Sequence, residues 1–216
     1  MPDRAGPEPR WPALVAVLAV GGLYAALPAS LAVGPRWLEL MIVCVLLVPT
    51  MISHRAGRHR TNNVLGQLIT AVMTVFMIWS LVLLVIALPA HKEPPVTLLR
   101  SAAALWVTNV LVFALWYWRL DGGGPHLRYS THGKDACAFL FPQIALQQSD
   151  PRPDPDDQPW TPMFIDYLFL AFNTSTAFSP TDTPVLSRWA KVLTMIQASI
   201  SLAVIAILAA RAVNIL

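Results

Sequence analysis

Long apolar runs separated by short polar stretches organise the chain. A helix that crosses the hydrocarbon core of a membrane needs roughly 17 to 25 residues at 1.5 Å per residue. Four of the six runs reach this length, the second is marginal, and the fifth is short. The runs cover residues 12–33, 37–52, 64–88, 102–118, 164–178 and 186–214. The pattern predicts an all-α, polytopic membrane helix bundle of five to six hydrophobic segments, in which the fifth is short or re-entrant.

Composition points to the same class of protein. Hydrophobic residues make up 56% of the 216 residues and charged residues 12%, whereas an average soluble domain has roughly 25% charged residues. A soluble fold would therefore have too little polar surface, and the lipid bilayer is the expected partner. We attribute the net charge of +3 to arginines beside the membrane, so nucleic-acid binding is not expected.

The first apolar run has two interpretations. Arg4 and Arg10 precede it, and small residues around Ala29 offer a cleavage position, which is typical of a signal peptide. The run continues to Val33, however, and the second run follows after only three residues. A retained helical hairpin is the simpler interpretation.

Basic residues and tryptophans predict the orientation and the segment boundaries. Arg55, Arg58 and Arg60 lie between the second and third runs. Because cytoplasmic loops retain positive charge, this loop and the N-terminus are expected on the cytoplasmic side, with the arginines at lipid headgroups. Most tryptophans lie near segment ends, as interfacial residues do. Trp79, deep in the third run, is expected to pack between helices.

Three regions follow from this pattern. Residues 1–119 form a four-helix transmembrane region, and residues 120–162 form a cytoplasmic loop. Within the loop, the tract 149–159 is rich in Pro and Asp and should be extended or disordered, whereas the apolar patch 136–142 should lie on the membrane surface or against the bundle. Residues 163–216 comprise a short membrane segment, a polar turn and a long C-terminal helix that begins near Pro184.

Polar side chains in the last region are the candidate functional residues. Inside lipid, an unpaired polar group is costly, so these side chains must be buried in protein, line a wet cavity or lie at the interface. Interhelical hydrogen bonds and a hydrated pathway are the two interpretations. The candidates on the polar string are Asn173, Thr174, Ser175, Thr176, Ser179 and Asp182, and those on one stripe of the last helix are Lys191, Thr194, Gln197 and Ser201.

Residues 166–176 followed by Asp182 resemble the pore helix and filter of tetrameric potassium-channel-type proteins. Phe172, Thr174 and Thr176 fall in register with that pattern, and the last run is similar to an inner helix. The resemblance covers about a quarter of the chain. Its permeation hypothesis implies a homo-oligomer that passes a monovalent ion. The glycine-rich filter is missing, and Pro180 in its place restricts the backbone, so the potassium selectivity of those pores should be lost.

The same C-terminal block also looks like a bacterial family of multi-span proteins without an established activity, and this resemblance implies a bacterial inner membrane. A potassium-type pore loop enters from outside, which conflicts with the orientation that the arginines predict. The alternative is a non-catalytic membrane scaffold or partner subunit. In that case Thr183 caps a helix whose first residue is Pro184, and the polar string is a tight turn, with the Asp182 charge favourable near the helix start.

Candidate catalytic groups are sparse, so we expect no enzyme. No serine-hydrolase, zinc-protease or phosphate-loop motif is present. His54 and His59 stand beside arginines, a setting suited to anionic headgroups. His126, His132 and the nearby Cys137 match no zinc spacing, so neither a metal nor another cofactor is expected. Cys44 and Cys137 are not expected to form a disulfide.

Overall fold

The computed structural model describes residues 8–90, 94–128, 137–149, 160–176 and 182–213. Within these ranges the chain is all helical apart from loops and one isolated bridge between Phe139 and Val185, which confirms the predicted all-α class. Four helices are long and apolar enough to cross a membrane, so the chain has the helices of a multi-span membrane protein. They are α2 (Leu38–Arg55), α3 (His59–Ala90), α4 (Pro95–Leu120) and α8 (Arg188–Val213).

The remaining helices are shorter. α1 spans Trp11–Ala25, α6 spans Pro142–Ser149 and α7 spans Phe164–Thr176, and two 3-10 turns, η1 (Ala29–Leu31) and η2 (Asp121–Gly123), follow α1 and α4. The prediction that the first helix continues to Val33 is wrong. Pro28 has an extended backbone, and the chain folds back so that the backbone N–H of Val33 donates to the Tyr24 hydroxyl over 2.6 Å.

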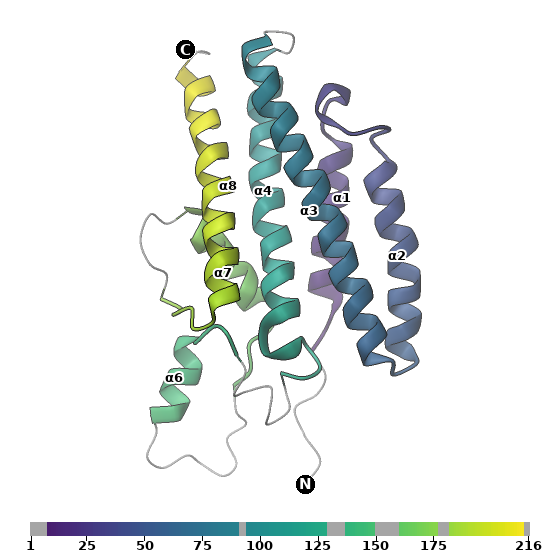
Figure 1. Cartoon of the computed structure of the whole chain (residues 1–216), viewed down its shortest axis with the longest axis vertical. Coiled ribbons are helices and arrows are strands. Elements are labelled where there is room, and N and C mark those ends of the chain that lie inside the picture. Colours follow the sequence, from purple (N-terminus) through teal and green to yellow (C-terminus); the bar gives the residue numbers. More distant parts are fainter. Residues whose placement is uncertain (1–7, 91–93, 129–136, 150–159, 177–181, 214–216) are drawn as a thin grey trace.

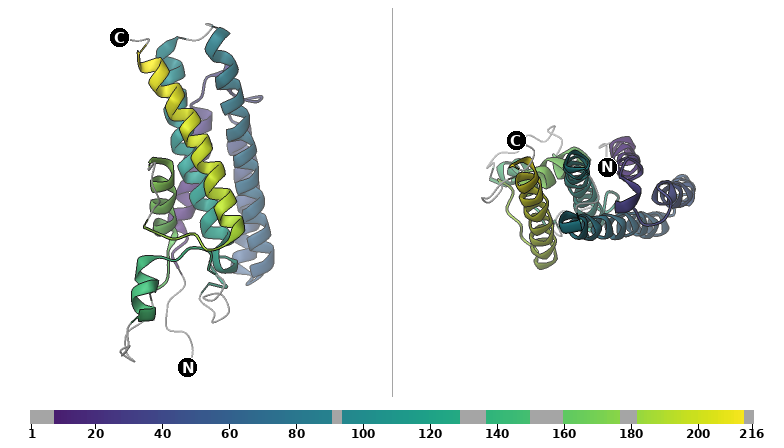
Figure 2. Two further views of the ribbon diagram at one scale, coloured as in Figure 1. Left: turned by 60° about the vertical axis from the view of Figure 1, so that its left-hand side comes forward. Right: turned by 90° about the horizontal axis from the view of Figure 1, so that it is seen from above.

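Helix α4 lies at the centre of the bundle. It packs against α1, α3, α7 and α8, while α2 packs against α1 and α3 (Figures 1 and 2). Most of its side chains are accordingly buried, including Asn109 and Thr108 in its middle. The outer helices bury one face and expose the other, and the exposed face is apolar, as lipid contact requires. Trp79 belongs to the outer face of α3 with 55% of its surface exposed, so the prediction that it packs between helices is wrong.

Helices α7 and α8 both begin at the end of the bundle where α4 ends. The ring of Phe139 contacts Tyr117 near the end of α4, Tyr167 in the first turn of α7 and Trp189 in the first turn of α8. Val185, which pairs with Phe139, places the chain at this same end after α7. α7 therefore rises beside only part of α8 and α4 before the chain returns (Figure 2).

Candidate functional site

The start of α7 is held by two carboxylates. The Asp166 carboxylate accepts the backbone N–H of Met163 over 2.8 Å, and the Glu8 carboxylate accepts that of Phe164 over 2.7 Å. Such bonds satisfy N–H groups that have no partner within the helix. Tyr167, Leu170 and other apolar side chains then bury one face of α7.

Gln197 joins three helices in the interior. Its amide nitrogen donates to the backbone oxygen of Ala171 over 2.7 Å and to the Ser175 hydroxyl over 2.8 Å. Its side-chain oxygen accepts from the Tyr117 hydroxyl over 2.5 Å, and its backbone oxygen accepts from Asn109 over 3.3 Å. The Gln197 side chain is fully buried, so these bonds replace solvent as its hydrogen-bond partners.

At the end of α7, side-chain hydroxyl groups donate hydrogen bonds to backbone carbonyl oxygens. The last four carbonyls of a helix have no partner within it. The Ser201 hydroxyl donates to the Ser175 carbonyl over 2.6 Å and itself accepts from the Trp106 indole over 3.0 Å. The Thr176 hydroxyl donates to the carbonyls of Phe172 and Asn173 over 3.0 and 3.4 Å. The polar string thus allows a helix to end inside an apolar bundle.

The structure divides the predicted candidates into two groups. Ser175, Gln197 and Ser201 are buried and bonded to one another across α7 and α8. The second group is half-buried or exposed and comprises Asn173, Thr174, Thr176, Asp182, Lys191 and Thr194. Ser179 lies outside the described residues. The candidates therefore do not share a single face.

The chain before α8 is extended. The prediction that Thr183 caps a helix starting at Pro184 is wrong, because α8 begins at Arg188. The Ser187 hydroxyl accepts the backbone N–H of Ala190 over 3.3 Å and is the cap instead. The preceding residues bond to the 138–140 backbone, with Leu186 donating to the Ala138 carbonyl over 2.7 Å. The apolar patch accordingly lies against the bundle.

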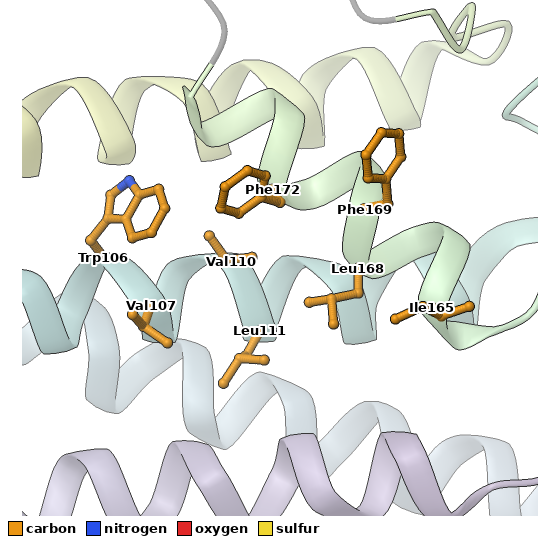
Figure 3. Close-up of a pocket in the computed structure, with 8 residues that line it drawn as sticks. All are labelled: Trp106, Val107, Val110, Leu111, Ile165, Leu168, Phe169 and Phe172. Carbon is orange, nitrogen blue, oxygen red and sulfur yellow. The ribbon is translucent and has the colours of Figure 1, made fainter.

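An apolar groove lies between α4 and α7. Figure 3 shows its eight lining residues, four from each helix: Trp106, Val107, Val110, Leu111, Ile165, Leu168, Phe169 and Phe172. Its volume is about 460 Å³. A groove with this lining offers an ion no replacement for its hydration shell. It is therefore not an ion path within one chain.

An ion pair that sequence reasoning missed joins the N-terminal segment to the loop. The Arg128 guanidinium lies 3.9 Å from the Glu8 carboxylate, and both side chains are buried. Trp118 donates its indole N–H to Glu8 over 2.9 Å, and Arg128 donates to the carbonyls of Trp118 and Pro162. Burial raises the pKa of Glu8, and these hydrogen bonds and the Arg128 charge oppose that rise. No sequence motif links these distant residues.

Asp121 continues this buried network beneath α4. Its carboxylate accepts the Ala138 backbone N–H over 2.5 Å and the Tyr167 hydroxyl over 2.6 Å. The Arg128 guanidinium stacks 4.6 Å from the centre of the Tyr167 ring. The loop after α4 and the start of α7 are thereby fixed to each other.

Three histidines meet at the same end of the bundle. The rings of His54 and His59 lie 5.7 and 3.9 Å from that of His126, and His59 Nδ1 is 3.0 Å from His126 Nε2. Arg10 also contacts His126 Nε2 and donates to Asn62 over 2.9 Å. Burial, followed by the Arg10 charge and the other two histidines, lowers the pKa of His126 to about 4. His126 therefore serves here as a neutral acceptor.

The predicted headgroup arginines are all exposed. Arg55 ends α2, Gly57 turns the chain with a φ of 66°, and Arg58 and Arg60 surround the start of α3. Cys44 and Cys137 are not joined in a disulfide. Within the part of the chain that the structure describes, no group of three His, Cys, Asp or Glu side chains is arranged to hold a metal ion. His132 and the Pro/Asp tract after Ser149 lie outside that part.

Comparisons of the chain with family models, with curated proteins and with solved structures find no match. The class that the fold defines is a helical protein with four helices able to cross a membrane. Its particular role follows from the geometry of its own residues.

Proposed function

We propose that the chain crosses a bacterial inner membrane five times, with a cytoplasmic N-terminus, and that α7 is re-entrant. Thirteen residues extend about 20 Å as a helix, which is shorter than the roughly 30 Å hydrocarbon core. The exposed arginines Arg55, Arg58 and Arg60 support a cytoplasmic location for the end of the bundle where α7 and α8 begin. α1, with fifteen residues, is also shorter than the core, but it counts as a crossing because α2 begins at the opposite end of the bundle and ends at Arg55 (Figure 1).

The proposed role is ion permeation without the potassium selectivity of the resembling pores. The observation that supports this role is that α7 ends beside the middle of α8, where the Ser201 hydroxyl donates a hydrogen bond to the Ser175 carbonyl. The C-terminal end of a half-helix has partial negative charge and favours a cation. Thr176 at the end of α7 and Asp182 ahead of α8 are both exposed and offer further oxygen atoms. Because the groove within one chain is apolar, the path for a monovalent cation forms between copies in a homo-oligomer.

A second candidate function is a non-catalytic membrane scaffold or partner subunit. The buried Gln197 contacts support it, because Ser175 and Ser201 use their hydroxyls within the bundle. In a scaffold these bonds stabilise α7, and no ion passes. The two candidates differ in what the exposed polar residues do.

Ion flux into proteoliposomes separates the two candidates. We expect the purified wild-type chain to carry potassium or sodium, and Asn173→Leu combined with Thr176→Val to reduce the flux several-fold, because both changes remove polar groups at the end of α7. Asp182→Asn should reduce cation flux by removing a charge. Chemical cross-linking should show a homo-oligomer.

Ser199→Ala is the matched control, since Ser199 is exposed on α8 and bonds only to the Met195 carbonyl one turn earlier. Its flux should equal that of the wild type. A wild-type chain that is folded and carries no ion, or variants whose flux is unchanged, would leave the scaffold as the function.

A further inference from the structure

Arg119 is a buried cation without a counter-charge. It lies one residue before the end of α4 and is 8% exposed. Its guanidinium rests on Gly66 of α3 so closely that a Cβ there would overlap it. Its Nε atom is enclosed without a hydrogen-bond partner, and the nearest ring, that of Trp118, lies 5.3 Å away. Among the described residues, no carboxylate lies within ion-pair distance of Arg119.

An uncompensated buried charge is strongly unfavourable in a folded protein. Arginine cannot relieve this cost by losing its proton, because the guanidinium retains its charge in proteins. A polar residue near the membrane in such a state indicates a functional site. Among the described residues no group supplies the missing negative charge, so a bound anion is the source we consider.

The groups around Arg119 are also basic. The charge of Arg10 acts on Arg119, and Arg10 lies against His126 and Asn62. His59 contacts the same His126 ring. Helices α2, α3 and α4, the segment before α1 and the loop after α4 all contribute to this end of the bundle. Arg119 and Arg10 thus lie among imidazole and amide groups that come from five parts of the chain.

The Glu8 carboxylate near this cluster already has partners. Glu8, two residues before Arg10, accepts hydrogen bonds from the Trp118 indole and the Phe164 backbone and pairs with Arg128. It is held on the side of α4 that faces α7. Glu8 therefore pairs with Arg128 and not with Arg119.

We propose that this end of the bundle binds a phosphate group, with Arg119 and Arg10 as its cationic ligands. The planar guanidinium matches two phosphate oxygens at once, which suits phosphate better than a small spherical anion. The phosphate belongs either to an anionic lipid headgroup or to a free phosphate ion, because exposed Arg55 and Arg58 attract both to this surface. The site is separate from the α7 end that carries the proposed function.

Thermal unfolding of the full chain in neutral detergent tests the site. The probes are inorganic phosphate, at a total ionic strength held constant with chloride, and phosphatidylglycerol compared with phosphatidylcholine. We expect phosphate or phosphatidylglycerol to raise the midpoint of unfolding, because a ligand of the folded state stabilises it. A rise with inorganic phosphate identifies a free-ion site. A rise with phosphatidylglycerol alone, together with the lipid mass retained in native mass spectrometry, identifies a headgroup site.

Arg119→Met should lower the affinity for the stabilising probe about tenfold, because it removes a charge-assisted hydrogen bond. Without a probe, the variant should be as stable as the wild type or more stable, since the buried charge is gone. If Arg119 served only to stabilise the fold, the variant would be less stable than the wild type and its affinity for the probe would be unchanged. Arg100→Met is the control, since Arg100 is exposed near the other end of α4 and its loss changes the net charge equally.

Arg10→Gln provides a second variant should Arg119→Met fail to fold. This variant should also have a lower affinity for the probe. Arg119→Lys should recover part of the affinity. The proposal is overturned if neither probe stabilises the wild type, or if the stabilisation is the same in the variants as in the wild type. Ion flux through the α7 end does not enter this test.

Discussion

At the scale of single residues, Gln197 shows how a polar side chain supports an apolar bundle. Its side chain makes three hydrogen bonds, two as donor to α7 and one as acceptor from Tyr117 on α4. Removing it leaves the Tyr117 hydroxyl and the Ala171 carbonyl without this partner in a site closed to solvent. Unsatisfied groups of this kind determine the cost of the substitution.

Gln197→Leu should lower the free energy of unfolding by about 1–3 kcal/mol, within the range for lost buried hydrogen bonds. The measurement is unfolding in detergent followed by circular dichroism. Ser199→Ala, on the exposed side of the same helix, should change stability by less than about 0.5 kcal/mol. Equal effects of the two substitutions would contradict the structural role of Gln197.

His126 predicts a pH dependence of stability. Its pKa is about 4 in the folded protein and about 6.5 in an unfolded chain. Between these values the unfolded state binds more protons, so stability decreases as pH falls from about 6.5 towards 4. His126→Gln keeps an acceptor for Arg10 and cannot titrate, so its unfolding midpoint should depend less on pH. Parallel pH profiles for the two proteins would refute this assignment.

At the scale of elements, the sequence predicts α7 well and misplaces the start of its neighbour α8. The short fifth run and its polar end follow from local composition, and the structure gives them a helix of thirteen residues. The start of α8 was placed near Pro184 because a proline after a threonine is a good local helix signal. The pairing of Val185 with Phe139 overrides that signal, and it comes from a segment far away in the chain.

Cysteine labelling tests the re-entrance of α7. In a chain with Cys44 and Cys137 replaced, we expect cysteines at Met163 and at Leu186, both exposed positions flanking α7, to react with a membrane-impermeant maleimide from the same side. The helix is too short to cross the hydrocarbon core. Labelling from opposite sides would mean that α7 crosses the membrane.

For the whole molecule, the apolar runs predicted the all-α class. The polar pattern included Ser175, Gln197 and Ser201 among ten candidates and did not single them out as a bonded group. Neither predicted the Glu8 and Arg128 pair, because each residue stands in a polar stretch with no local pattern. The basic cluster around His126 was missed for the same reason. Local composition determines which segments are helical, whereas these buried sites depend on contacts between segments far apart in the chain.

The bond between Glu8 and the backbone of Phe164 joins residues 156 positions apart. A ribosome adding roughly 5 to 20 residues per second needs about 8 to 30 s to produce that interval. During this time Phe164 has not been synthesised, so the Glu8 carboxylate cannot form this hydrogen bond. Closure of this end is consequently a late event of biogenesis, and it cannot precede the emergence of α7 from the ribosome.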